Sequence, residues 1–248
     1  LGCPIRMILR LGGGDLNALF GIAGFAGGIG FGTIFLKRGY SLQRTYALSK
    51  LESAMMPAIQ VGLLVLVVTA PAFIFFSQKG PGAMHAPWLI SLAAGIVVGG
   101  LSQFSRLCTV GGFRDLFLFK KSILIFGYLA VLVGVFLVNI SFGNFHLGFE
   151  NQPIAHTDGL WNFLGMALAG FCSVLLGGCP LRQLIMTGEG NSDAAVTVLG
   201  LAAGAAFAHN FGLAASGAGP TLNGQIAVGV GFVVALIIAI LNTKRANA

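Results

Sequence analysis

The sequence predicts an all-α polytopic membrane protein: a pseudo-twofold bundle of about seven transmembrane helices, with short re-entrant half-helices and an inverted repeat. Composition, seven long apolar stretches and a repeated cysteine motif support this prediction. Of 248 residues, 56% are hydrophobic, 38 are glycine and only 8% are charged, against about 25% charged in soluble domains. The mean hydropathy is +0.90. Lipid must therefore surround most of the chain, and intrinsic disorder is excluded.

Seven stretches are long enough to cross a membrane, which takes about 20 mostly apolar residues. A soluble helical core would show polar faces at a helical period, whereas these stretches are apolar all round. The predicted spans are residues 16–36, 55–76, 87–104, 122–142, 159–176, 194–211 and 225–241.

The cationic residues orient these spans. Seven crossings place Arg6, Arg10 and Lys79 on one side and the other eleven of the 14 Lys and Arg residues on the opposite side. Cytoplasmic loops carry the excess of positive charge, so we expect a cytoplasmic C-terminus and an outside loop at residues 143–158. The same bias explains the net charge of +7 without a nucleic-acid partner. The eleven are Lys37, Arg38, Arg44, Lys50, Arg106, Arg114, Lys120, Lys121, Arg182, Lys244 and Arg245.

Glycines recur every four residues in several spans, and such stripes let helix backbones approach closely in lipid. We therefore expect a compact bundle. The stripes are Gly24, Gly28 and Gly32, then Gly95 and Gly99, then Gly200 and Gly204.

A cysteine motif occurs twice. Gly2-Cys3-Pro4-Ile5-Arg6 recurs as Gly178-Cys179-Pro180-Leu181-Arg182, and the same register continues without a gap for nearly 30 residues. Five predicted crossings separate the copies, so the second copy is expected to be inverted. Inverted repeats are typical of transport folds. We expect one membrane transport domain over residues 1–248, with repeat copies near 2–76 and 178–241 and a further segment before Leu1.

Each motif predicts a short half-helix. Proline suits the first turn of a helix, which puts the preceding cysteine at the N-cap. About two turns follow Cys179 before Gly188. Broken helices at membrane depth are tolerated where they line a cavity. A third cysteine segment runs from Ser105 through Cys108 to Asp115.

These motifs favour binding of a small anion containing sulfur or selenium. A helix N-terminus carries partial positive charge and free N–H groups, a nearby arginine adds a full charge, and a soft thiol can donate a weak hydrogen bond. An inert buried role is expected for Cys172, a disulfide is disfavoured, and no zinc or haem spacing is present, so neither metal nor cofactor is expected. The predicted path residues are Cys3, Cys108, Cys179, Arg6, Arg182, Arg106 and Arg114, supported by Gly2, Pro4, Gly178, Pro180, Glu189, Asp193 and Asp115.

At these residues the sequence resembles the YeeE/YedE family of bacterial inner-membrane proteins. The resemblance rests on Gly2-Cys3, on Arg106, Cys108 and Arg114-Asp115, and on Gly178-Cys179. It implies inverted halves and cysteines in line along a narrow central path that passes thiosulfate inward. The motif at 178–182, followed by residues 188–193, is most similar to the YedE-type branch linked to selenium metabolism.

The leading functional hypothesis is import of a thiosulfate-like or selenium-containing anion by a bacterial inner-membrane protein that is not an enzyme. An alternative is a membrane relay in which a cysteine persulfide is handed to a cytosolic sulfurtransferase-like or selenium-metabolism partner. A third is a structural subunit of a larger membrane complex. The chain shows no Walker motif, which disfavours ATP-driven transport by this chain alone.

Overall fold

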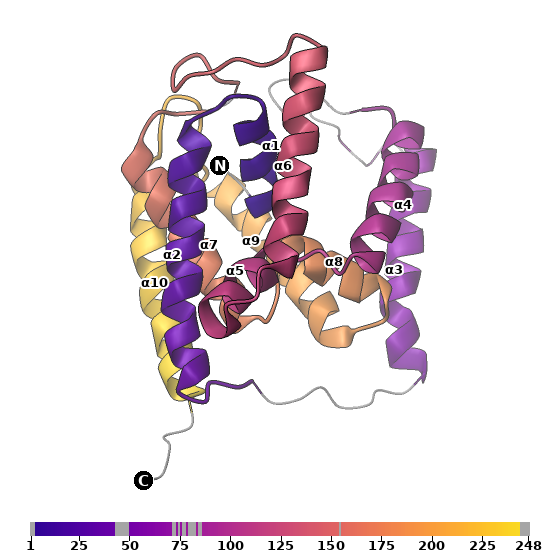
Figure 1. Cartoon of the computed structure of the whole chain (residues 1–248). Helices are drawn as coiled ribbons and strands as arrows, with labels where there is room; N and C mark the ends of the chain where they lie inside the picture. Colours follow the sequence, from indigo (N-terminus) through magenta and orange to yellow (C-terminus); the bar gives the residue numbers. More distant parts are fainter. Residues whose placement is uncertain are drawn as a thin grey trace. The chain divides into compact units, whose positions relative to one another are not determined.

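The computed structural model describes residues 3–42, 50–70, 86–153 and 155–243, with the single residues 73, 75, 78 and 83. Gly2 lies outside the described residues, as do Arg44, Lys79, Lys244 and Arg245. Figure 1 shows the order of the helices. Within the described residues they are α1 (Pro4–Gly12), α2 (Asn17–Lys37), α3 (Lys50–Thr69), α4 (Trp88–Phe104), α5 (Thr109–Phe119), α6 (Ile123–Ser141), α7 (Gly159–Leu175), α8 (Pro180–Gly188), α9 (Ser192–Asn210) and α10 (Leu222–Leu241).

Six helical stretches in the described part of the chain are long and apolar enough to cross a membrane. They cover six of the expected spans, and the protein is therefore an all-helical, multi-pass membrane protein. The expected span at 55–76 corresponds to α3, but the apolar part of α3, Pro57–Thr69, is shorter than the six spanning stretches. The total of seven membrane-spanning helices therefore stays a prediction. Two of the six stretches, Trp88–Phe119 and Gly159–Gly188, contain a break.

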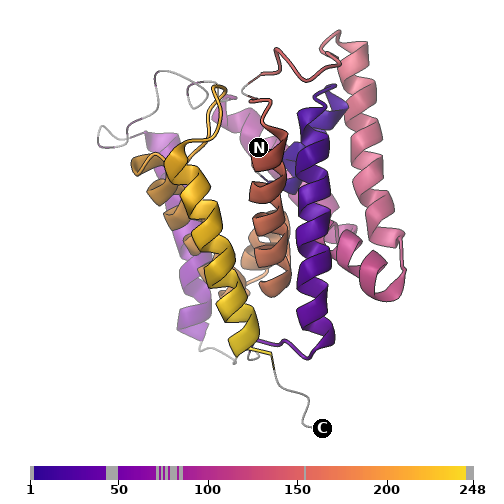
Figure 2. The ribbon, with the colours of Figure 1, turned by 90° about the vertical axis from the view of Figure 1, so that its left-hand side faces the viewer.

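The chain divides into two compact units. The first comprises Leu1–Arg44, Leu107–Arg182 and Leu199–Ala248, and the second comprises Thr45–Arg106 and Gln183–Val198. The centre of the first unit is the long contact of α2 with α7, and Figure 2 shows α7 lying between α2 and α10.

Glycine makes the contact between α2 and α7 possible. A Cβ atom on Gly24 would overlap the carbonyl of Phe163, and one on Gly28 would overlap the carbonyl of Ala167. The expected close packing is thus confirmed for the stripe on α2. For the other two stripes it stays a prediction, because no described heavy atom lies within 4 Å of a Cβ atom built there. Those positions are Gly95, Gly99, Gly200 and Gly204.

A buried polar cluster holds α1 in place. The Arg10 guanidinium forms an ion pair with Asp15 at 2.6 Å, and only 2% of Asp15 is exposed. The Asn17 side-chain amide donates hydrogen bonds to Asp15 Oδ1 at 3.0 Å and to the Phe149 carbonyl at 2.6 Å. The turn between α1 and α2 is therefore tied to the loop after α6. Because α1 has nine residues, or about 13 Å, it is too short to span a core of about 30 Å.

The second unit contains α3, α4, most of α8 and the first turns of α9. The Gln103 amide donates a hydrogen bond to the Glu189 carboxylate. The Asn191 side chain accepts the Ala194 N–H at 2.9 Å. Asn191 therefore caps α9.

Candidate functional site

Three of the four cysteines stand where a helix begins. Cys3 is the N-cap of α1 and Cys108 the N-cap of α5. Cys179 directly precedes α8, whose first residue is Pro180. Pro4 and Pro180 each occupy the first helical position, where the missing N–H of proline costs no intrahelical hydrogen bond. The motif therefore produces the cysteine-capped short helices that the sequence predicts.

The two breaks inside apolar stretches share a local backbone feature. Two residues before Cys108, Arg106 has a φ of 51°, and two residues before Cys179, Gly177 has a φ of 82°. A positive φ ends a right-handed helix. Glycine adopts this conformation at no steric cost, whereas it is uncommon for arginine. Each break thus turns the chain just before a thiol.

Cys108 and Cys179 come together. Their thiols lie beside each other. The Cys108 sulfur accepts the Gly111 N–H at 3.3 Å, and the Arg182 backbone N–H points at the Cys179 sulfur. Two short helices, α5 and α8, therefore begin at one pair of sulfur atoms and direct first-turn N–H groups toward it.

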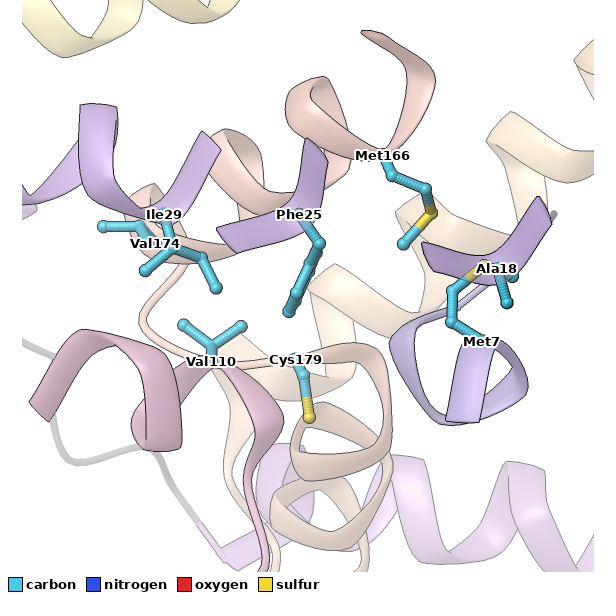
Figure 3. Packing of buried hydrophobic residues seen from close by; sticks show 8 residues of the cluster. All are labelled: Met7, Ala18, Phe25, Ile29, Val110, Met166, Val174 and Cys179. Atoms are coloured by element: carbon cyan, nitrogen blue, oxygen red, sulfur yellow. The ribbon is translucent and has the colours of Figure 1, made fainter. Parts of the chain in front are cut away.

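The surroundings of the pair are apolar. Cys179 is fully buried, in one cluster with Phe25 of α2, Val110 of α5 and two methionines. Figure 3 shows Phe25, Val110 and Cys179 gathered together, with Met7 and Met166 to one side. Cys108 is partly buried against the same cluster. The cluster therefore contains the soft sulfur atoms of two methionines and two cysteines.

Tyr128 of α6 lies near Cys3 and this pair, and it was not among the residues selected from the sequence. Its hydroxyl donates a hydrogen bond to the Pro4 carbonyl at 2.9 Å and lies near the thiols of Cys3 and Cys179. Its ring packs edge-on against Phe113 of α5, with centroids 5.8 Å apart. The sequence signal that could have identified Tyr128 is its hydroxyl group within a mostly apolar span. A polar group at membrane depth needs a hydrogen-bond partner.

The predicted arginines differ in placement. Arg6 is exposed. Arg182 is half-buried, and its backbone N–H points at the Cys179 sulfur. Arg114 forms an ion pair with its sequence neighbour Asp115 at 2.9 Å. Arg106 belongs to the second unit, whereas the three thiols belong to the first.

The other predicted supporting residues divide in the same way. Gly178 is buried next to Cys179, and its N–H donates to the Ser173 carbonyl at 3.1 Å. Glu189 and Asp193 belong to the second unit, where Glu189 bonds to Gln103 and Asp193 lies in the first turn of α9. All four cysteines are free. Cys172 packs in a separate cluster around Phe171.

Thr109 places a hydroxyl next to the thiol pair. The residue is 1% exposed. Its hydroxyl lies near Cys179, but in no geometry that makes a hydrogen bond with a described residue. A buried hydroxyl without a partner costs about 1–3 kcal/mol. Such a group is a donor ready for a ligand at the thiols.

We expect Thr109→Val to leave the free energy of unfolding unchanged or to raise it by about 1 kcal/mol. Valine keeps the shape and removes an unpaired polar group. Thermal unfolding in detergent measures the change, and Thr109→Ser, which keeps the hydroxyl, serves as the matched control. A loss of stability in the valine variant alone would show that the hydroxyl is paired within the protein.

One comparison with known proteins gives a match. The model of a family described as sulphur transport matches residues 104–244, more than half of the chain. This range includes Cys108, Cys179 and the two helices that begin at them. Comparisons with curated proteins and with solved structures find no match.

Proposed function

Because the chain belongs to the sulphur transport family, we propose that it imports a small anion containing sulfur or selenium along a path lined by Cys3, Cys108 and Cys179. Thiosulfate and selenium species of similar size are the proposed substrates. The observation that carries this proposal is the meeting of Cys108 and Cys179 at the starts of two short helices. We further propose a bacterial inner-membrane location with the C-terminus in the cytoplasm, from the distribution of cationic residues.

In the proposed path, hydrogen-bond donors of the protein take the place of the water molecules that hydrate the anion. An anion that leaves water for an apolar interior loses hydration at a large cost. The N–H groups at the starts of α5 and α8 and the S–H groups of the cysteines supply hydrogen bonds in its place. Thiols donate weakly, so the anion is held without being trapped. The proposal involves no covalent step.

The burial of Cys179 favours transport over a persulfide relay. A relay to a cytosolic protein needs a sulfur atom that the partner can reach. Cys179 is fully buried and its neighbour Cys108 is partly buried. A small ion passing through the chain can meet both thiols, whereas a folded partner cannot.

Uptake into proteoliposomes tests the proposed function. We expect vesicles containing the protein to accumulate labelled thiosulfate or selenite well above protein-free vesicles, and unlabelled thiosulfate to compete. Labelled sulfate is the matched control because it has similar size and charge but neither a terminal sulfur atom nor a selenium atom. Equal accumulation of all three anions would contradict a path that selects anions by a polarizable sulfur or selenium atom. Accumulation of none of them would contradict import.

A further inference from the structure

The first unit contains a second place suited to a small anion, at the N-terminal ends of α7 and α10. A cavity of about 240 Å³ lies there, lined by the first turns of both helices and by the loop that precedes α10. This volume equals roughly eight water molecules, which is ample for a tetrahedral oxyanion. We call it the α7–α10 cavity.

Polar side chains in this cavity have hydrogen-bonding capacity to spare. His156 Nδ1 is buried and has no hydrogen-bond partner among the described residues. Trp161 and Gln225 also line the cavity, and neither the indole N–H nor the side-chain amide makes a hydrogen bond with a described residue. Trp161 and Gln225 therefore bring two uncommitted neutral donors to the lining and His156 adds an imidazole, which indicates a site for a hydrogen-bond acceptor.

Electrostatics favour an anion. The starts of two helices carry partial positive charge, and both α7 and α10 begin at the cavity. The Asp158 carboxylate accepts the Trp161 backbone N–H at 3.2 Å and caps α7, and it lines an adjoining polar pocket that shares His156 and Gln225 with the cavity. Burial lowers the pKa of His156, an effect that Asp158 opposes and Arg10 reinforces. The imidazole is therefore neutral near pH 7 and keeps one N–H to donate.

Met166 is shared by the cavity and the buried cluster that contains Cys179. Its side chain lines the cavity, yet it is only 4% exposed and belongs to the buried cluster of Cys179. Figure 3 shows it next to Met7 on one side of Phe25. A thioether is polarizable, so it suits the sulfur end of a ligand whose oxygen atoms bind the donors.

We propose that the α7–α10 cavity is a capture site for a sulfur oxyanion with a terminal sulfur atom, with oxygen atoms on His156, Trp161 and Gln225 and sulfur toward Met166. The proposal rests on the proposed function and adds a binding site separate from the thiols. It also selects among the substrate classes, because hydrosulfide and hydroselenide carry no oxygen for these donors.

Tryptophan fluorescence of the whole chain in detergent tests the site with thiosulfate as the probe. The chain has two tryptophans, so Trp88→Phe leaves Trp161 as the sole reporter. We expect a saturable change in emission, with sulfate binding at least tenfold more weakly. Gln225→Met removes a donor of similar length and is expected to weaken binding about three- to tenfold. No saturable change, or equal affinity for sulfate, would overturn the proposal.

Gly165→Leu tests the cavity more directly than Gln225→Met does, because it fills the proposed binding space. Gly165 lines the cavity, and a Cβ atom there has no other heavy atom within 4 Å, so leucine fills the space without a backbone clash. Gly229→Leu is the matched control, since Gly229 also faces open space but does not line the cavity. We expect Gly165→Leu alone to abolish thiosulfate binding. Binding that persists in Gly165→Leu overturns the site.

The two proposals fail in distinguishable ways. Serine variants of Cys108 and Cys179 should still bind thiosulfate in the cavity while losing uptake. Saturable binding without uptake by the unmodified protein would contradict import and leave the capture site standing. Uptake that is unaffected by Gly165→Leu would contradict the capture site and leave import standing.

Discussion

Replacing Cys179 with Ser is expected to reduce uptake of the transported anion at least tenfold. Serine keeps the approximate size but removes the polarizable sulfur atom from the point where α5 and α8 begin, next to Cys108. Serine is a harder and stronger donor than the thiol, and a change of about 1.5 kcal/mol in one hydrogen bond to a charged group corresponds to roughly a tenfold change in an equilibrium. Cys108→Ser and Cys3→Ser are expected to have effects of the same order.

The chain provides a matched control for this experiment. Cys172 is also partly buried on a helix, but it packs in the cluster of Phe35 and Phe171 and not with the other thiols. We expect Cys172→Ser to retain uptake. Initial rates in proteoliposomes, normalised to inserted and folded protein, give the comparison. Retained uptake after simultaneous replacement of Cys3, Cys108 and Cys179 would contradict the thiol path and leave an ordinary anion pathway.

Gly28→Ala is expected to destabilise the protein by about 3 kcal/mol or more, because overpacking of a tight contact typically costs 1–3 kcal/mol even where side chains can shift. Here the added methyl group overlaps the backbone carbonyl of Ala167 on α7. A backbone carbonyl within a helix cannot move aside without separating α2 from α7. The amount of monodisperse protein extracted from membranes and its unfolding temperature measure the effect.

Gly204→Ala is the control for this substitution. Gly204 occupies the position corresponding to Gly28 in the second copy of the repeat, but a Cβ atom there has no other heavy atom within 4 Å. Alanine is also the better helix former by about 1 kcal/mol. We therefore expect Gly204→Ala to be neutral or stabilising. If Gly28→Ala and Gly204→Ala lost equal stability, the assignment of the close contact to the glycines of α2 would be contradicted.

The repeat was visible in the sequence because both copies obey the same local chemistry. Each has a cysteine, a proline at the first helical position and a glycine where the short helix ends, and each is followed by a long apolar helix. These are local rules of helix start and stop, so composition and spacing are enough to predict them. The antiparallel relation of the copies stays a prediction, since much of α8 and the start of α9 belong to the second unit.

The glycine stripes show the limit of such rules. The spacing in residues 24–32 matches that in residues 200–204, yet within the described residues another backbone lies against the stripe on α2 and none lies against the stripe on α9. Glycine spacing shows that another helix can pack closely against this one. Which helix packs there depends on the arrangement of all the helices, and for α2 the neighbour is α7, more than 130 residues later in the chain.

Apolar periodicity, charge distribution and the proline and glycine positions determined a multi-pass helical protein with cysteines at helix starts, because each signal acts within a few residues along the chain. Only the tertiary structure decided that Cys108 meets Cys179, that Tyr128 bonds to the Pro4 carbonyl, and that His156, Trp161 and Gln225 line one cavity with Met166. Those contacts join helices that are distant in sequence. Apolar spans carry little information about their neighbours, because almost every face of them is compatible with lipid.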